Sequence, residues 1–510
     1  MEQELMETKV NTYVEQFKML DEKISRLSSI SGLLDWDQKV IAPKKSRQFF
    51  SKAVGELETE IFKLMVSEEM GDLLEVLARH EVLNTLDQNT KARVRIHKAF
   101  YEKNKQIPAE VYKEYAILTS EANGAWETAR EENNYASYLP YLEKMIQFKR
   151  QFAEYMGYEK HPYDALLDEY EPGLTVEKLD QVFAELREAT ILLLEKIKKS
   201  PNKPSKEIFL KAYDVEKQKQ FNRFMLPLLG FDLEAGRLDE TVHPFAQSVN
   251  VGDVRITTRY LEENVLSALF GTIHEAGHGI YEQRINPELD GTVLSQGASY
   301  GIHESQSRFL ENMVGRSKEF WEYFLPHLQN YFPEHLKDVS VEDFYKAVNV
   351  VEPSFIRVEA DELTYNLHII IRYEIEKALI EGKLEAKDLP KVWNEKMEKY
   401  LGIIPDTDRD GVLQDIHWSF GAFGYFPSYT LGNLYAAQIL KKLGSTLPSM
   451  YEHVKEGNIE GLLEWLSENI HQYGSIYTPD ELIEKVTGEE LNASYLIEYL
   501  EEKYTAVYGL

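Results

Sequence analysis

The chain has 510 residues, of which 43% are hydrophobic and 28% charged, as in an ordinary soluble globular protein. Its 57 basic and 86 acidic residues give a formal net charge of −29, which disfavours nucleic acid and anionic membranes as partners. The sequence has no cysteine and no aliphatic run near the roughly 20 residues that span a bilayer, so disulfides, thiol catalysis and membrane spans are not expected. We expect a cytoplasmic protein.

Helical periodicity dominates the chain from its first part onward. Apolar side chains recur every three or four positions over 10–24 and again over 179–186, which predicts amphipathic helices. Breaks rich in proline or glycine at 171–173 and 200–204 separate the helices. Further on, Thr478 is followed by proline, aspartate and glutamate, the pattern of a helix start with a capping box.

Strand-like sequence is scarce. The best cases are 254–258 and 292–294, which lie on either side of a long apolar helical segment. We find no internal repeat and no low-complexity tract. The sequence therefore predicts a mostly α-helical fold with a small β-sheet beside that helical segment.

The run His274-Glu275-Ala276-Gly277-His278 lies inside this apolar segment and is the strongest chemical signal. In a helix the two histidines share one face, one turn apart, and can hold one divalent metal ion, while Glu275 is placed to accept a proton from water. The alternative is an amphipathic helix with two satisfied histidines. Apolar flanks predict instead a buried helix, where two close histidines without a metal or acidic partners are costly. These flanking residues are Leu266, Leu269, Phe270, Ile273, Ile280 and Tyr281.

A third protein ligand is needed, because catalytic zinc usually has three protein ligands and one open position. Without cysteine, the ligand must be His, Asp or Glu. Glu304 is the favoured candidate, since it follows His278 at a distance that allows a loop and the start of an antiparallel helix. His303 is the rival ligand or a supporting group. Without the first motif, Glu304 would be an ordinary solvated helix carboxylate.

Two further segments are ambiguous on sequence alone. Arg357 lies in a largely apolar segment and needs an anionic partner, because arginine does not lose its charge. That partner is either a local carboxylate, Glu359 or Asp361, or the carboxylate of a substrate. The glycine- and aromatic-rich segment 411–429 holds His417 and several tyrosines, which either donate hydrogen bonds to a developing oxyanion or form an aromatic core corner.

The segment around the first predicted strand is equally open. Arg255 and Asp253 are two residues apart and are expected to pair across a strand edge, unless Arg255 contacts a substrate. The preceding His243-Pro244-Phe245 carries no specific assignment.

Together these segments resemble the Taq-type thermostable metallocarboxypeptidase family, which carries the same motifs in the same order over nearly the whole chain. The matching residues are Leu34-Asp35-Trp36-Asp37-Gln38; His243-Pro244-Phe245; Asp253, Arg255 and Thr257; His274-Glu275-Ala276-Gly277-His278; His303-Glu304-Ser305-Gln306-Ser307; Ile356-Arg357 with Ala360-Asp361; and Gly411-Val412-Leu413-Gln414-Asp415-Ile416-His417-Trp418. One departure is Arg308, where an apolar residue is expected, and we expect it to lie away from the chemistry.

The resemblance implies a gluzincin, neurolysin-like fold with two helical lobes around a deep groove. It implies residues 1–240 as a mainly helical lobe forming one groove wall, 241–440 as the catalytic core and 441–510 as C-terminal helices packed on it. It also implies a homodimer that releases single C-terminal residues of broad specificity from peptides with a free carboxylate. The alternatives are an oligoendopeptidase of similar architecture, and a non-catalytic peptide-binding protein with a vestigial metal site.

The same resemblance assigns roles to residues. His274, His278 and Glu304 are implied to bind one zinc or cobalt ion per chain, with Glu275 as the base.

For the substrate, Arg357 is the implied anchor of the C-terminal carboxylate. Tyr429 is the implied oxyanion donor, with Tyr425 less favoured, and His417 is expected to shape the pocket for the C-terminal residue. Arg255 is expected to restrict the length of peptide that enters.

Overall fold

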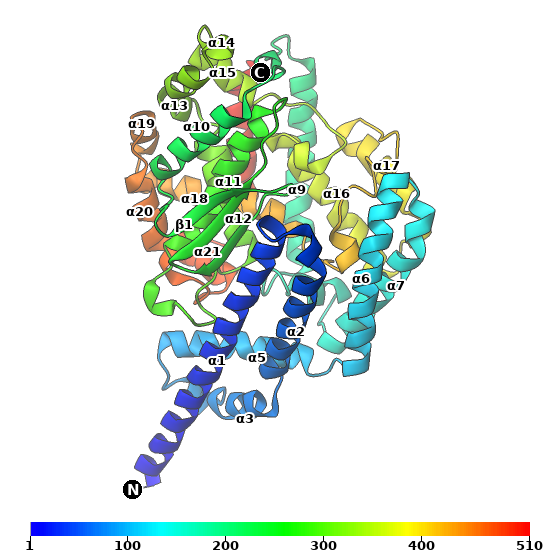
Figure 1. Cartoon of the computed structure of the whole chain (residues 1–510), viewed down its shortest axis with the longest axis vertical. Helices are drawn as coiled ribbons and strands as arrows, with labels where there is room; N and C mark the ends of the chain where they lie inside the picture. The colour runs from blue at the N-terminus through cyan, green and yellow to red at the C-terminus, as the bar shows by residue number, and fades with distance from the viewer. Residues whose placement is uncertain (1) are drawn as a thin grey trace.

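The computed structural model describes residues 2–510. Helices make up most of it and three strands form one small sheet, as the sequence predicted (Figure 1). Among these residues, no helix is both long enough and apolar enough to cross a membrane.

The described residues up to 228 form helices joined by loops and turns. Helix α1 packs against α2, and α6 packs against α7 (Figure 1). Side-chain caps mark several starts: Ser67, Asp87 and Thr175 each accept a hydrogen bond from a backbone N–H of the first turn. The helices of this part are α1 (Glu2–Val40), α2 (Arg47–Met65), α3 (Glu68–Leu77), α4 (His80–Leu83), α5 (Gln88–Asn104), α6 (Ala109–Glu132), α7 (Tyr135–Met156), α8 (Pro162–Leu167), α9 (Val176–Lys199) and α10 (Val215–Leu228).

The sheet follows, in the order β1-β3-β2. The central strand β3 (Asp253–Thr258) runs parallel to β1 (Gly236–Glu240) and antiparallel to β2 (Ala246–Asn250). This confirms the strand predicted at 254–258. The sheet packs on helix α11 (Val265–Gln283), the helix that carries the two histidines.

Gly279 of α11 makes this packing close. A Cβ atom at Gly279 would lie 3.1 Å from the side chain of Ile256, which is fully buried on β3. The small sheet therefore lies directly beside the histidine-bearing helix.

The strand predicted at 292–294 is wrong, because this segment forms turns. The backbone N–H of Thr292 donates to the carbonyl of Leu289, and that of Ser295 donates to Thr292. Val293 N–H instead donates to the buried carboxylate of Asp21 on α1. Since these backbone donors have local or side-chain partners, none is left to pair with a strand.

The rest of the chain is again helical. Thr478 begins α21 with the predicted capping box, in which its side chain and that of Glu481 each accept a backbone N–H. A π-helical turn, η4 (Phe309–Val314), continues α12 directly. The remaining helices are α12 (Tyr300–Arg308), α13 (Lys318–Tyr331), α14 (Pro333–Leu336), α15 (Val341–Val348), α16 (Glu362–Glu381), α17 (Leu389–Leu401), α18 (Pro427–Thr446), α19 (Met450–Lys455), α20 (Glu460–Asn469), α21 (Pro479–Thr487) and α22 (Ser494–Tyr508).

One continuous hydrophobic core runs from α5 to α22, and a second, smaller one lies among α1 to α5. Between the helices lies a deep groove of about 2820 Å³. Residues of α1, α5, α6, β2, α11, α12 and α18 line this groove. The structure thus has a deep groove, as expected, and a domain boundary after residue 240 would divide β1 from the other two strands of its sheet.

Candidate active site

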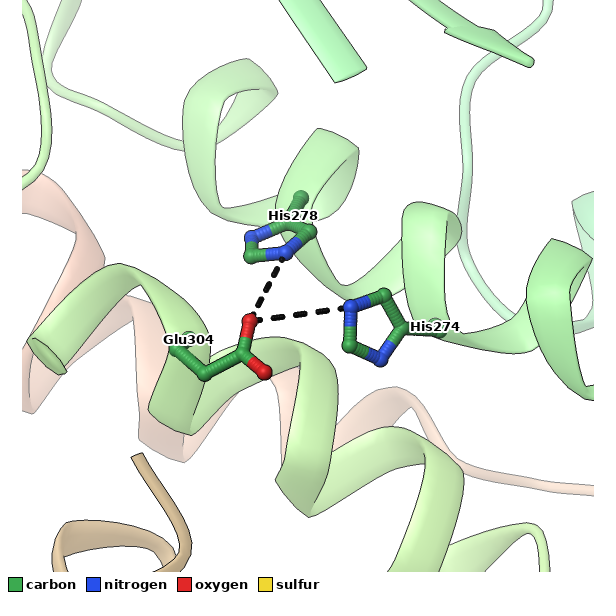
Figure 2. Close-up of side chains that lie close together, drawn as sticks. All are labelled: His274, His278 and Glu304. Carbon is green, nitrogen blue, oxygen red and sulfur yellow. Dashed lines mark ion pairs between the residues drawn. The ribbon is translucent and has the colours of Figure 1, made fainter. Parts of the chain in front are cut away.

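The three predicted metal ligands meet at the groove. His274 and His278 lie one turn apart on α11, and Glu304 faces them from α12 (Figure 2). Glu304 Oε2 is 3.6 Å from His274 Nε2 and 3.3 Å from His278 Nε2. All three ligand atoms lie within 4.8 Å of one another, so one divalent ion fits between them.

Two glycines allow the helices to approach this closely. A Cβ atom at Gly277 of α11 would lie 2.6 Å from the backbone oxygen of Gln306 on α12. A Cβ atom at Gly432 of α18 would lie 2.4 Å from Cγ of Glu304. Helix α12, which carries the ligand Glu304, is therefore packed closely against both α11 and α18.

Each imidazole is oriented from behind by a carboxylate, directly for His274 and through His303 for His278. His274 Nδ1 lies 2.8 Å from Glu311 Oε2. His278 Nδ1 lies 2.6 Å from Nδ1 of His303, whose Nε2 lies 2.6 Å from Glu282 Oε1. With protons on Nδ1 of His278 and Nε2 of His303, both donate along this chain toward Glu282, and Nε2 of His278 is left free for a metal. The rival ligand His303 therefore supports His278 from behind.

The charges of the ligands follow from burial and from these contacts. Burial lowers the pKa of His278 to about 3, which keeps it neutral as a metal ligand must be. Burial also acts to lower the pKa of His274, but the carboxylates of Glu304 and Glu311 outweigh it and raise that pKa. Burial acts to raise the pKa of Glu304, and the opposing charges of Arg308 and the histidines lower it below its usual range.

Glu275 lies next to His274 on α11 and lines the groove. Only 6% of the residue is exposed, and among residues 2–510 its Oε2 is one of the buried oxygens that lack a hydrogen-bond partner. Burial raises its pKa to about 7. A carboxylate with a free oxygen and a pKa near neutrality can accept and return a proton.

Arg357 lies in a short 3₁₀ turn, η5 (Arg357–Glu359), that precedes α16. Its Nε and Nη2 donate to Asp415 Oδ1 at 3.0 and 2.9 Å, and its Nη1 donates to the hydroxyl of Tyr365 at 3.1 Å. Asp415 Oδ2 also accepts from Arg372, at 2.7 Å from Nε. The prediction that Arg357 pairs with Glu359 or Asp361 is therefore wrong. The carboxylate that it binds comes from the distant segment 411–418.

Two guanidinium groups thus share one carboxylate. Arg357 and Asp415 line the groove, whereas Arg372 is fully buried behind them. The cluster of Arg357, Arg372 and Asp415 carries a net charge of +1. Its cationic member that lines the groove is Arg357.

Aromatic residues surround this cluster. The Arg357 guanidinium lies 4.8 Å from the ring centroid of Tyr429, whose hydroxyl is 3.2 Å from Nε2 of His417. The ring of Tyr425 stacks on His417 with centroids 5.5 Å apart. Burial lowers the pKa of His417 to about 3 and raises that of Tyr429 above its usual value, so both side chains are neutral near pH 7. The segment forms an aromatic corner that also presents polar donors to the groove.

The family model described as Carboxypeptidase Taq (M32) metallopeptidase matches residues 16–504. The chain belongs to this family. Carboxypeptidase 1 of Bacillus subtilis is 49% identical to it, over 98% of this chain and 100% of that protein, and Thermostable carboxypeptidase 1 of Thermus thermophilus is 43% identical, over 95% and 96%. The crystal structure of the M32 carboxypeptidase from Deinococcus radiodurans matches this structure with a TM-score of 0.94. The match covers 98% of this chain and 100% of that one, and the two sequences are 36% identical. The resemblance seen in the sequence is confirmed, and the chain is a metallocarboxypeptidase.

In this M32 carboxypeptidase, Arg255 does not join the other predicted site residues. It donates to both oxygens of Asp253, at 2.8 and 2.7 Å, which confirms the expected pair. Its guanidinium lies 4.7 Å from the ring centroid of Trp36 on α1. Arg255 is not among the described residues that line the groove, whereas His243 is one of them.

Arg308 lies nearer to the chemistry than expected. Its Nε donates to Glu304 Oε1 at 2.7 Å. The expectation that Arg308 lies away from the site is therefore wrong, because residues four apart share one face of α12.

Sequence reasoning also missed residues that support the ligands. Glu282 lies one turn after His278 on α11, and Glu311 lies two turns after Glu304. Helical spacing from each known ligand was the available signal for both.

Proposed function

We propose that this M32 carboxypeptidase releases single residues of broad specificity from peptides with a free C-terminal carboxylate, using one Zn²⁺ or Co²⁺ ion bound by His274, His278 and Glu304. The observation that carries the proposal is the convergence of this triad beside the unpartnered oxygen of Glu275 in the groove. Two imidazole nitrogens and one carboxylate oxygen are a donor set that suits a catalytic zinc site, and cobalt accepts the same ligands.

When bound, the metal supplies Lewis acidity, which activates water and polarises the scissile carbonyl. Glu275 accepts the proton of the attacking water at Oε2 and later delivers it to the leaving amine. The neutral hydroxyl of Tyr429 donates a hydrogen bond to the oxyanion that develops at the carbonyl.

Arg357 fixes which bond is cut. Its positive cluster with Asp415 and Arg372 attracts the C-terminal carboxylate, and the distance from this anchor to the metal triad selects the last peptide bond. His417, packed beside Tyr425, shapes the pocket for the C-terminal side chain. A role for Arg255 in limiting peptide length receives no support from its position, and the homodimer, the cytoplasmic location and the division at residues 240 and 440 stay predictions.

Product analysis tests this function against the endopeptidase alternative. A peptide with a blocked N-terminus is incubated with the protein, with and without chelator, and mass spectrometry follows the products. We expect stepwise loss of C-terminal residues that stops with chelator and returns with zinc or cobalt. Internal fragments would favour an oligoendopeptidase, and intact peptide under every metal would favour a peptide-binding protein.

A further inference from the structure

The two oxygens of the ligand Glu304 have different partners. Oε2 faces both imidazoles (Figure 2). It also accepts a hydrogen bond from the hydroxyl of Ser307 at 3.1 Å. Oε1 accepts the hydrogen bond from Nε of Arg308 at 2.7 Å. Oε2 is thus the oxygen that faces the metal position, and Oε1 accepts a charge-assisted hydrogen bond from a guanidinium.

Arg308 itself is held in place by neighbours outside the ligand set. Its Nη1 donates to Glu311 Oε2 at 3.3 Å, and its guanidinium lies 4.3 Å from the ring centroid of Tyr365. Glu311 is in turn fixed by His274 at 2.8 Å and by Arg316 at 3.2 Å. Only 13% of the Arg308 side chain is exposed. The hydrogen bond from Arg308 to Oε1 of Glu304 is therefore part of a packed network of side chains.

The hydrogen bond to Oε1 matters because a carboxylate can bind a metal through one oxygen or through both. A catalytic site needs a position that no protein atom fills, where water and substrate enter. If Oε1 of Glu304 were free, it could turn toward the ion and fill that position. A hydrogen bond from a fixed guanidinium opposes this turn.

We propose that Arg308 is a positioning residue that reserves Oε1 of Glu304, so that Glu304 gives the metal one oxygen only. The inference rests on the proposed function, because it takes His274, His278 and Glu304 as the ligands. It differs from a purely structural role, in which the pair of Glu304 with Arg308 only stabilises α12 and leaves the coordination unchanged.

The test counts the ligands of the bound metal. The full chain is loaded with Co²⁺, and its visible absorption and its X-ray absorption at the cobalt edge are compared between native protein and variants. Arg308→Met keeps an unbranched side chain over Tyr365 but removes the donor, and Arg308→Lys keeps a donor within reach of Oε1. Arg316→Met is the matched control, because it removes a guanidinium from Glu311 without touching Glu304.

We expect Arg308→Met to add one oxygen neighbour to the cobalt ion and to weaken its visible absorption, as for a higher coordination number. Arg308→Lys and Arg316→Met are expected to keep the native spectra. Native spectra for Arg308→Met would overturn the inference alone. Failure of the native protein to bind Co²⁺ at the triad would overturn the proposed metal site as well. Arg308→Ala repeats the test if thermal unfolding shows that the methionine variant does not fold.

Discussion

Replacing Arg357 by methionine tests the anchor most sharply, because the structure defines what is lost. Arginine has five N–H donors. Two of those on Arg357 are used by Asp415 and one by Tyr365, so one on Nη1 and one on Nη2 are left for a peptide carboxylate. Asp415 keeps Arg372 as a partner in the variant, and the net charge of the cluster falls from +1 to zero.

The expected loss follows from these two charge-assisted hydrogen bonds. Truncating one partner of a buried charge pair costs about 2–4 kcal/mol, which corresponds to roughly a 30- to 1000-fold fall in kcat/KM for peptides with a free carboxylate. The assay compares each peptide with its C-terminal amide. Native protein should cut the amide more slowly by a similar factor, and Arg357→Met should cut both peptides at similar rates.

Arg357→Lys separates charge from geometry, since lysine keeps the charge but not the two-pronged donor. It should recover part of the preference for the free carboxylate. The reasoning is refuted if native protein cuts free and amidated peptides equally well. It is also refuted if Arg357→Met slows both peptides by the same factor.

Three further predictions concern the base, the helix packing and a buried carboxyl group. Glu275→Gln should retain the metal but lower kcat by roughly 10²- to 10⁴-fold, and near-native turnover in a metal-replete sample would contradict its role. Gly432→Ala should destabilise the fold by about 1–3 kcal/mol and weaken metal binding, because its Cβ would overlap Glu304; unchanged thermal unfolding and chelator competition would contradict this. Burial raises the pKa of Glu376 from 4.5 to about 7, so the stability it contributes is present below pH 4.5 and is lost as the pH rises through 7. The unfolding free energy of the native protein relative to Glu376→Gln should therefore fall by about 3 kcal/mol between pH 4.5 and 8 in urea titrations, and a pH-independent difference would contradict this shift.

Helices and metal ligands were predictable because their signals are local. The spacing of His274 and His278 defines one helix face, and the capping box at Thr478 lies within four residues. The strand at 254–258 was recognised from its β-branched residues. Strand β1 was not, because its sequence Gly-Arg-Leu-Asp-Glu is largely polar and its pairing depends on β3.

Contacts between segments far apart in the sequence could not be predicted from local sequence patterns. Asp415 binds Arg357 across 58 positions, so the nearer carboxylates looked equally suitable in the sequence. The segment 292–294 has strand-like residues, but its backbone bonds to nearby turns and to Asp21 on α1. The contact of Arg308 with Glu304 was within reach, since four residues make one helical turn.

Metal titration is the sharpest test of a single catalytic metal ion at His274, His278 and Glu304. Protein stripped by chelator and dialysed is titrated with Zn²⁺, and in a parallel series with Co²⁺, while release of the C-terminal residue is measured. We expect activity that is absent at the start and rises in proportion to added metal until one ion is bound per chain. We also expect Glu304→Gln to bind the metal more weakly. Full turnover by metal-free protein, or activity that does not follow the added metal, would show that catalysis does not depend on a metal ion at this site.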